Sequence, residues 1–242
     1  MEKMKIEIWS DIACPYCYIG KRKLEEALNK FPHKENVEII WRSYELNPDL
    51  PATPLNESIY QFIASQYNVT VEQQKKNMEQ ISSSAHSVGL NFDFDRTVVA
   101  NTSKALRLVK LATKYNLANE AEEALFDAYF VSGKDISDNK TLLNIGTGIG
   151  IPQSEIDGLL NSDQFVDEVK KDIEYSEEEL NLQYIPFYRM NDKFIIQGSV
   201  TTDEYLETLN KAYESWSGND TSSTKGDSIS GKACSIDGVC EI

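Results

Sequence analysis

Two cysteines separated by two residues, in the stretch Cys14-Pro15-Tyr16-Cys17, are the residues of this chain best suited to chemistry. Such a pair can form a disulfide, reduce one, or exchange with one through a mixed disulfide. The pair follows the apolar run Ile6–Trp9 and precedes the amphipathic run Lys21–Phe31. That order is typical of a strand, a tight turn and a helix. The sequence therefore predicts thiol–disulfide chemistry at the amino end of a helix.

Pro15 favours a helix that begins directly after Cys14, because its fixed φ is helical and it has no backbone N–H that needs a partner. With Cys14 at the cap, its sulfur faces unpaired backbone N–H groups and the positive end of the helix dipole. Both features favour the thiolate form of Cys14. Cys17, one turn further along, is positioned to attack a mixed disulfide and release the partner. Asp11, three residues before Cys14, is a candidate for tuning thiol proton transfer, or equally a turn or capping residue.

A second cysteine pair, Cys234 and Cys240, stands near the end of the sequence. It follows residues 217–231, whose Gly, Ser, Thr, Asn and Asp content predicts a flexible linker. A linker of that length lets the pair reach Cys14, so one hypothesis is an accessory dithiol that exchanges electrons with Cys14 and Cys17. A tail disulfide or idle thiols are the plainer alternative. Zinc held by all four cysteines is a third, although five intervening residues are wide for a zinc knuckle.

The elements that must position these residues follow from periodicity. Residues 5–53 have the pattern of strand, helix and strand, and residues 55–181 are almost all helical in pattern. Beta character returns at residues 187–190 and 194–197, separated by Asn191-Asp192, a pair that favours a hairpin turn. A last helix begins with a capping box from Thr201 to Glu204.

This pattern predicts an α/β fold in which a mixed sheet is flanked by helices and interrupted by a large helical insertion. Residues 1–54 and 182–217 would form the discontinuous core, and residues 55–181 the insertion. Residues 218–242 would form a flexible linker and a cysteine-bearing tail.

Pro186 stands where the chain re-enters the sheet, in Tyr184-Ile185-Pro186-Phe187. A proline that starts a strand is tolerated only at special places. If the Ile185–Pro186 bond is cis, Pro186 can pack against the dithiol and leave the Ile185 backbone free to pair with a substrate strand. An ordinary trans proline at a strand edge is the alternative.

The bulk properties exclude several classes of protein. A formal charge of −15 argues against a nucleic-acid binder, which needs clustered Lys and Arg. No window approaches the ~20 apolar residues of a membrane span, and residues 1–5 lead into a strand without a signal-like apolar stretch. We expect a cytoplasmic protein that binds no membrane. Four cysteines in a reducing compartment favour catalysis, metal binding or redox sensing over a permanent disulfide framework.

The chain resembles the DsbA-like thioredoxin-fold oxidoreductases, specifically the FrnE-like branch. The motifs that carry the resemblance are the run Trp9–Gly20, Ile185-Pro186-Phe187, Gly198-Ser199 and the cysteine-bearing tail. The resemblance implies that Cys14 attacks, Cys17 resolves and Pro186 is the cis-proline. The expected partners are protein or low-molecular-weight thiols and disulfides. The chemistry needs no cofactor, and glutathione is a possible co-substrate.

Two departures and two rival functions accompany the resemblance. Leu106 stands where the family usually has His, and Val200 ends a Gly-Ser-Val run where Gly-Ala-Gln is common. Kappa-class glutathione transferases and related isomerases share the architecture, but they use a single Ser or Cys in place of an intact pair. A zinc-binding or holdase-like interaction protein is the alternative from another class. The sequence gives no indication of the oligomeric state.

Overall fold

The computed structural model of the chain describes residues 2–218, 227–235 and 240. The strands within these residues are β1 (Met4–Ser10), β2 (Val37–Ser43), β3 (Tyr184–Ile185), β4 (Phe187–Met190), β5 (Phe194–Gln197), β6 (Ser228–Ser230) and β7 (Cys234–Ser235). The α-helices are α1 (Pro15–Lys30), α2 (Ile59–Tyr67), α3 (Val71–His86), α4 (Ser103–Thr113), α5 (Ala118–Phe126), α6 (Asn139–Gly148), α7 (Gln153–Leu160), α8 (Val166–Glu178) and α9 (Thr202–Trp216). Two short elements complete them, the 3-10 turn η1 (Lys34–Asn36) and the π-helical turn η2 (Asp127–Val131).

The central sheet has the strand order β2-β1-β4-β5-β6. β1 runs parallel to β2 and antiparallel to β4, and the hairpin of β4 and β5 turns through Asn191 and Asp192, both with positive φ. β1 is buried at every position but Lys5, as suits a strand that is covered on both faces. The predicted strands and the hairpin turn are therefore confirmed.

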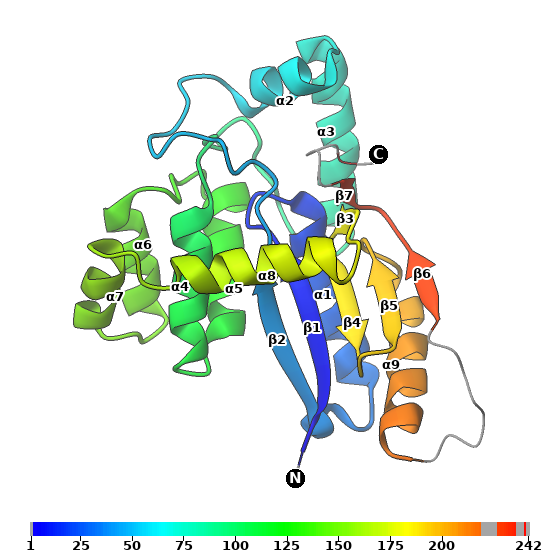
Figure 1. Cartoon of the computed structure of the whole chain (residues 1–242). Coiled ribbons are helices and arrows are strands. Elements are labelled where there is room, and N and C mark those ends of the chain that lie inside the picture. The colour runs from blue at the N-terminus through cyan, green and yellow to red at the C-terminus, as the bar shows by residue number, and fades with distance from the viewer. Residues whose placement is uncertain (1, 219–226, 236–239, 241–242) are drawn as a thin grey trace.

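Helices cover both faces of the sheet. In Figure 1, α1 and α9 lie behind the strands and pack on each other, whereas α8 crosses in front. The backbone carbonyl of Asp172 in α8 accepts a hydrogen bond from the Trp9 indole, and its carboxylate accepts one from the Ser43 backbone N–H. These bonds tie α8 to β1 and β2. The sequence placed α8 in the insertion of residues 55–181, but it forms part of the layer that covers the sheet.

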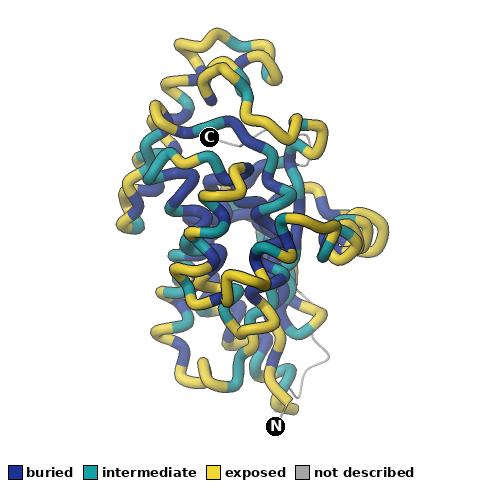
Figure 2. Tube along the Cα trace, turned by 90° about the vertical axis from the view of Figure 1, so that its left-hand side faces the viewer, coloured by how far each residue is buried: buried dark blue, intermediate teal, exposed yellow. Residues whose placement is uncertain are grey.

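The insertion itself is helical, as predicted, and lies beside and above the sheet in Figure 1. α5 continues into η2, where one wider turn changes the direction in which its side chains project. α7 follows Pro152 and was not expected from the sequence, because it is only two turns long. Figure 2 shows buried chain running through the centre of the molecule, with exposed segments around its outside.

The tail is more ordered than its composition suggests. β6 runs parallel to β5, with Ile195 opposite Ser228, and Ile229 packs against the core. The prediction of a flexible linker over residues 217–231 is therefore wrong for residues 227–231, while residues 219–226 lie outside the described residues. Strand pairing uses backbone groups, so a serine-rich segment can add to a sheet edge. The close approach also needs glycine, because a Cβ on Gly231 would lie 2.6 Å from the carbonyl carbon of Ser199.

Candidate active site

Cys14 is the N-cap of α1, with extended φ and ψ, and Pro15 is the first helical residue. The Cys14 backbone N–H donates to the Asp11 carbonyl at 3.0 Å, and the Cys17 N–H donates to the Cys14 carbonyl at 3.1 Å. Both cysteines are free thiols and almost fully buried, with exposed fractions of 0 % and 1 %. The predicted placement of the dithiol at the start of a helix is confirmed.

The Cys17 thiol binds its proton more tightly than an ordinary cysteine does. Burial raises the pKa of the Cys17 thiol well above its usual value, and a hydrogen bond to Cys14 raises it further. Cys17 therefore keeps its proton and shares it with the sulfur of Cys14. Cys14 accepts this hydrogen bond and lies at the N-terminus of α1.

The Ile185–Pro186 peptide bond is cis, so the trans alternative is wrong. The sulfur of Cys14 lies 3.8 Å from the Ile185 carbonyl oxygen. Pro186 packs on α1 at Gly20. The proline Cγ would lie only 3.3 Å from a Cβ added at that glycine. Two segments that are far apart in sequence thus meet at the dithiol, as the sequence predicted for a cis proline.

The tail occupies the backbone that the sequence left free for a substrate. β7 pairs antiparallel with β3, so that Cys234 lies opposite Ile185 and Ser235 opposite Tyr184. Cys234 forms a disulfide with Cys240. The expectation that the Ile185 backbone is open is wrong in this structure, because the chain pairs with itself there. A free dithiol and a disulfide are therefore held at the same short strand.

The far end of the tail disulfide is held by the insertion. The Cys240 backbone N–H donates to the Tyr67 hydroxyl of α2 at 3.1 Å. Tyr67 was not singled out in the sequence. Its only signal was its place at the end of an amphipathic helix, which does not distinguish a contact with the tail from ordinary packing.

Asp11 is buried and fixes the turn before Cys14. Its carboxylate accepts hydrogen bonds from the backbone N–H groups of Ala13 at 3.2 Å and Leu46 at 2.8 Å. Burial raises the pKa of Asp11 to about 6, against the opposing effect of these hydrogen bonds. The turn-forming alternative is therefore realised in the structure. A role in proton transfer stays a prediction.

Glu122 in α5 is a second buried acid near this region, and sequence reasoning missed it. Its Oε2 atom has no hydrogen-bond partner among the described residues. Burial raises the pKa of Glu122 to about 8, with Lys21 acting in the opposite direction and Asp11 in the same one. The sequence does carry a signal for this burial. Glu122 precedes the apolar Leu125 by three residues and Phe126 by four, which puts it on the buried face of the helix.

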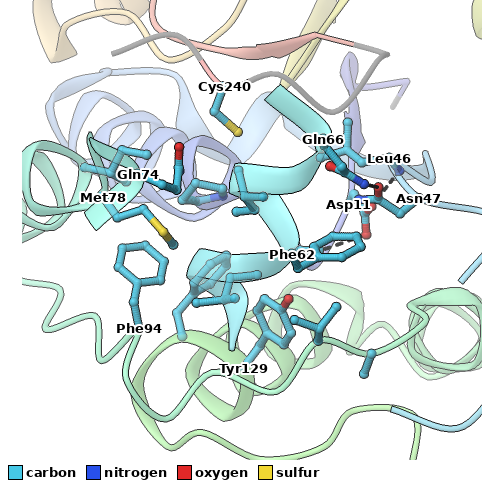
Figure 3. Close-up of a pocket in the computed structure, with 18 of the residues that line it drawn as sticks. Asp11, Leu46, Asn47, Phe62, Gln66, Gln74, Met78, Phe94, Tyr129 and Cys240 are labelled. Atoms are coloured by element: carbon cyan, nitrogen blue, oxygen red, sulfur yellow. Dashed lines mark hydrogen bonds between the residues drawn. The ribbon is translucent and has the colours of Figure 1, made fainter. Parts of the chain in front are cut away.

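A cavity of about 230 Å³ adjoins the dithiol. Figure 3 shows Tyr129 and Cys240 on opposite sides of it, with Asp11 and Gln66 at one end and Met78 and Phe94 at the other. Most of its wall comes from the insertion. The sequence did not predict this pocket, because its lining comes from many separate elements.

The alternative zinc site of four cysteines is not assembled, because two of them share the tail disulfide. Within residues 2–218, 227–235 and 240, no group of three His, Cys, Asp or Glu side chains is arranged to hold a metal ion. In the same residues, no helix has the length and apolar character that crossing a membrane requires.

A family of known sequences, the DSBA-like thioredoxin domain, matches residues 5–210. The chain belongs to this family. The predicted fold class and the predicted enzyme class, a DsbA-like thiol–disulfide oxidoreductase, are thereby confirmed.

Individual relatives agree with this assignment. A probable DsbA oxidoreductase from Streptomyces coelicolor has 26 % identity and a TM-score of 0.82, with 99 % of each chain covered. A cytosolic disulfide reductase, DsbM from Pseudomonas aeruginosa, shares the fold at 13 % identity and a TM-score of 0.56, covering 89 % of this chain and 98 % of its own. The uncharacterized protein YwbO of Bacillus subtilis (strain 168) is 22 % identical over 84 % of this chain and 94 % of its own.

Proposed function

We propose that this protein exchanges disulfides through Cys14 and Cys17, and that the tail disulfide Cys234–Cys240 is its built-in exchange partner. The observation that carries the proposal is the pairing of Cys234 with Ile185, whose carbonyl oxygen lies 3.8 Å from the Cys14 sulfur. A disulfide substrate needs an extended, cysteine-bearing segment that pairs with the backbone of β3, and the tail supplies such a segment. The tail therefore occupies the site as a substrate would.

The exchange proceeds in two steps that conserve atoms and electrons. The Cys14 thiolate attacks the Cys234 sulfur, so the Cys14–Cys234 bond forms and Cys240 leaves as a thiolate that takes up a proton. Cys17 then loses its proton and attacks Cys14, which forms the Cys14–Cys17 disulfide and releases Cys234. Two electrons have passed to the tail. Because each step is reversible, the same path reduces or oxidises Cys14 and Cys17 according to the partner outside the protein.

The residues around the sulfurs have separate roles in this proposal. Cys14, at the start of α1 and hydrogen-bonded to Cys17, is the attacking sulfur. The Ile185 backbone aligns the incoming disulfide, and Pro186 holds that backbone against α1. Asp11 sets the geometry of the turn that presents Cys14. None of these roles requires a metal or a nucleotide.

We place the reaction in the cytoplasm and take protein or low-molecular-weight disulfides as its substrates. The structural relative DsbM is described as a cytosolic disulfide reductase, and it has also been solved with GSH. The intact pair Cys14 and Cys17 supports disulfide exchange over a transferase or isomerase that needs one nucleophile.

Reduction of insulin disulfides by dithiothreitol tests the dithiol. Cys14→Ser should abolish the catalysed rate, because Cys14 is the attacking sulfur in this proposal. Cys17→Ser should accumulate mixed disulfides, because the intramolecular thiol that resolves them is gone and only dithiothreitol can release them. Full activity of Cys14→Ser would contradict the assignment.

The tail's part is tested separately in the double variant Cys234→Ser/Cys240→Ser. We expect it to keep direct exchange through Cys14 but to lose turnover with those partners that reach the dithiol through the tail. Unchanged turnover with every reductant and protein substrate would refute the exchange between the two pairs and leave the role of Cys14 intact.

A further inference from the structure

The cavity beside the dithiol is placed to hold whatever group a substrate carries next to its disulfide. Ala13 and Pro15, the two neighbours of Cys14 in the chain, both line it. Cys240 lines it as well, so one sulfur of the tail disulfide already borders the space. Cys14 itself does not line the cavity, so a group carried by a disulfide at Cys14 would enter it past these two neighbours.

The wall of the cavity is mostly apolar. Its larger aliphatic and aromatic side chains come from the loop before α2, from α2, α3 and η2, and from the segment between α3 and α4: Leu50, Ile59, Phe62, Ile63, Met78, Ile81, Phe94, Val99, Tyr129 and Phe130. η2 contributes the last two, from the turn where α5 widens into a π-helix. The wider turn thus serves to direct two aromatic rings into the cavity.

The polar part of the wall carries no positive charge. Among the described residues that line the cavity, none is Lys, Arg or His, and Asp11 is the only acidic residue. The others are neutral amides and hydroxyls, such as Asn47 and Gln66. An anionic group placed here would meet a carboxylate and find no cation to pair with, which is unfavourable in a partly enclosed apolar site.

These properties discriminate between two kinds of disulfide. Each half of oxidised glutathione carries two carboxylates at neutral pH, and sites that bind carboxylates tightly supply cationic partners. An uncharged apolar group has no such need and gains from leaving water. An apolar cavity of about 150 Å³ is large enough to hold benzene, so a cavity of about 230 Å³ accommodates one aromatic ring or a branched aliphatic side chain.

We propose that this pocket binds an uncharged apolar group attached to the substrate's disulfide, and that it makes the enzyme select apolar disulfides over glutathione disulfide. The inference rests on the proposed function, because it names the substrate class of the same dithiol. Cys240 lines the pocket, and its backbone N–H is hydrogen-bonded to the Tyr67 hydroxyl. The tail must therefore move aside for the group to enter. Substrate binding and tail docking therefore compete for one site.

Three disulfides separate the contributions of charge and apolar contact. Dibenzyl disulfide supplies an aromatic ring, glutathione disulfide supplies carboxylates, and 2-hydroxyethyl disulfide supplies a small neutral group. All three are alkyl disulfides, so their intrinsic reactivity toward a thiolate is similar. With the full chain, we expect kcat/KM for dibenzyl disulfide to exceed that for glutathione disulfide by on the order of 10- to 100-fold. Equal values, or a preference for glutathione disulfide, would overturn the proposal.

Two substitutions test the pocket as the cause. Ile63→Trp fills the cavity from α2 and should lower the ratio of kcat/KM for dibenzyl to that for 2-hydroxyethyl disulfide by about tenfold. Gln66→Arg places a cation on the exposed side of the same helix, at the pocket, and should raise kcat/KM for glutathione disulfide several-fold. Its matched control is Ser65→Arg, an exposed neighbour that does not line the cavity, which should leave all three values unchanged.

The outcomes separate this inference from the function on which it rests. If turnover depends on Cys14 but Gln66→Arg and Ser65→Arg behave alike on glutathione disulfide, the pocket does not set selectivity and the inference fails alone. If Cys14→Ser retains turnover, the proposed function fails first.

Discussion

The two cysteine pairs of this chain are held by different kinds of structure. Cys14 and Cys17 lie within one helical turn, so residues next to them, above all Pro15, determine their geometry. Cys234 is held by a two-residue strand pair with a segment distant in sequence, and Cys240 by a hydroxyl of the insertion. A helix start is specified locally, whereas a short strand pair depends on where its partner lies. Cys14 and Cys234 are both fully buried, but the geometry of the first pair is set within one helix, whereas the second pair is placed by contacts with segments distant in sequence.

The largest expected effect is on the free energy of unfolding and comes from Glu122, the buried acid of α5. Glu122→Gln should remove a pH dependence of stability, because the folded protein holds the Glu122 pKa at about 8 against 4.5 for the free side chain. The folded state then binds one more proton than the unfolded state between these values. The wild type therefore loses stability as pH rises toward 8, by about 2 kcal/mol between pH 6.5 and 8.5, and the variant does not.

Denaturant unfolding between pH 6.5 and 8.5 measures this difference, in a range above the Asp11 pKa of about 6. The exposed Glu120→Gln on the same helix is the control and should follow the wild type. Parallel pH profiles for wild type and Glu122→Gln would show that Glu122 is ionised in the folded protein.

The second effect concerns the attachment of the tail. Gly231→Val should dislodge the tail without changing any cysteine, because a side chain at Gly231 would collide with the Ser199 carbonyl group. Overpacking of this kind costs about 1–3 kcal/mol. The buried thiol of Cys14 should then react with iodoacetamide about 10- to 100-fold faster under native conditions. Gly148→Ala, where an added Cβ meets nothing within 4 Å, should leave the rate unchanged. An unchanged rate in Gly231→Val would mean that the tail does not shield Cys14.

The smallest effect concerns the single hydroxyl that holds Cys240. Tyr67→Phe removes the acceptor of the Cys240 N–H, worth about 1 kcal/mol, and should speed reduction of the tail disulfide by dithiothreitol about fivefold. The measurement uses a Cys14→Ser/Cys17→Ser background, in which the tail disulfide alone is reduced. Tyr60→Phe on the same helix is the control. Equal rates in the two variants would remove Tyr67 from the account.

The contrast between the pairs also explains what the sequence could predict. The capped helix at Cys14, the strand at residues 37–44 and the hairpin turn at Asn191-Asp192 follow from neighbouring residues, and all are found. β6 and the pairing at Cys234 were missed, because backbone pairing leaves no periodic pattern in a serine-rich segment. The pocket was missed for the same physical reason. Its lining is gathered by tertiary packing, and no local pattern marks it.

The most direct test of the central claim, exchange between the two pairs, is disulfide mapping in Cys17→Ser. Without the Cys17 thiol, the forward path stops at the mixed disulfide, and alkylation of the released Cys240 thiol prevents the reverse step. After alkylation of free thiols and proteolysis, mass spectrometry should find Cys14 joined to Cys234 and Cys240 alkylated. Alkylated Cys14 beside an intact Cys234–Cys240 disulfide would contradict the account.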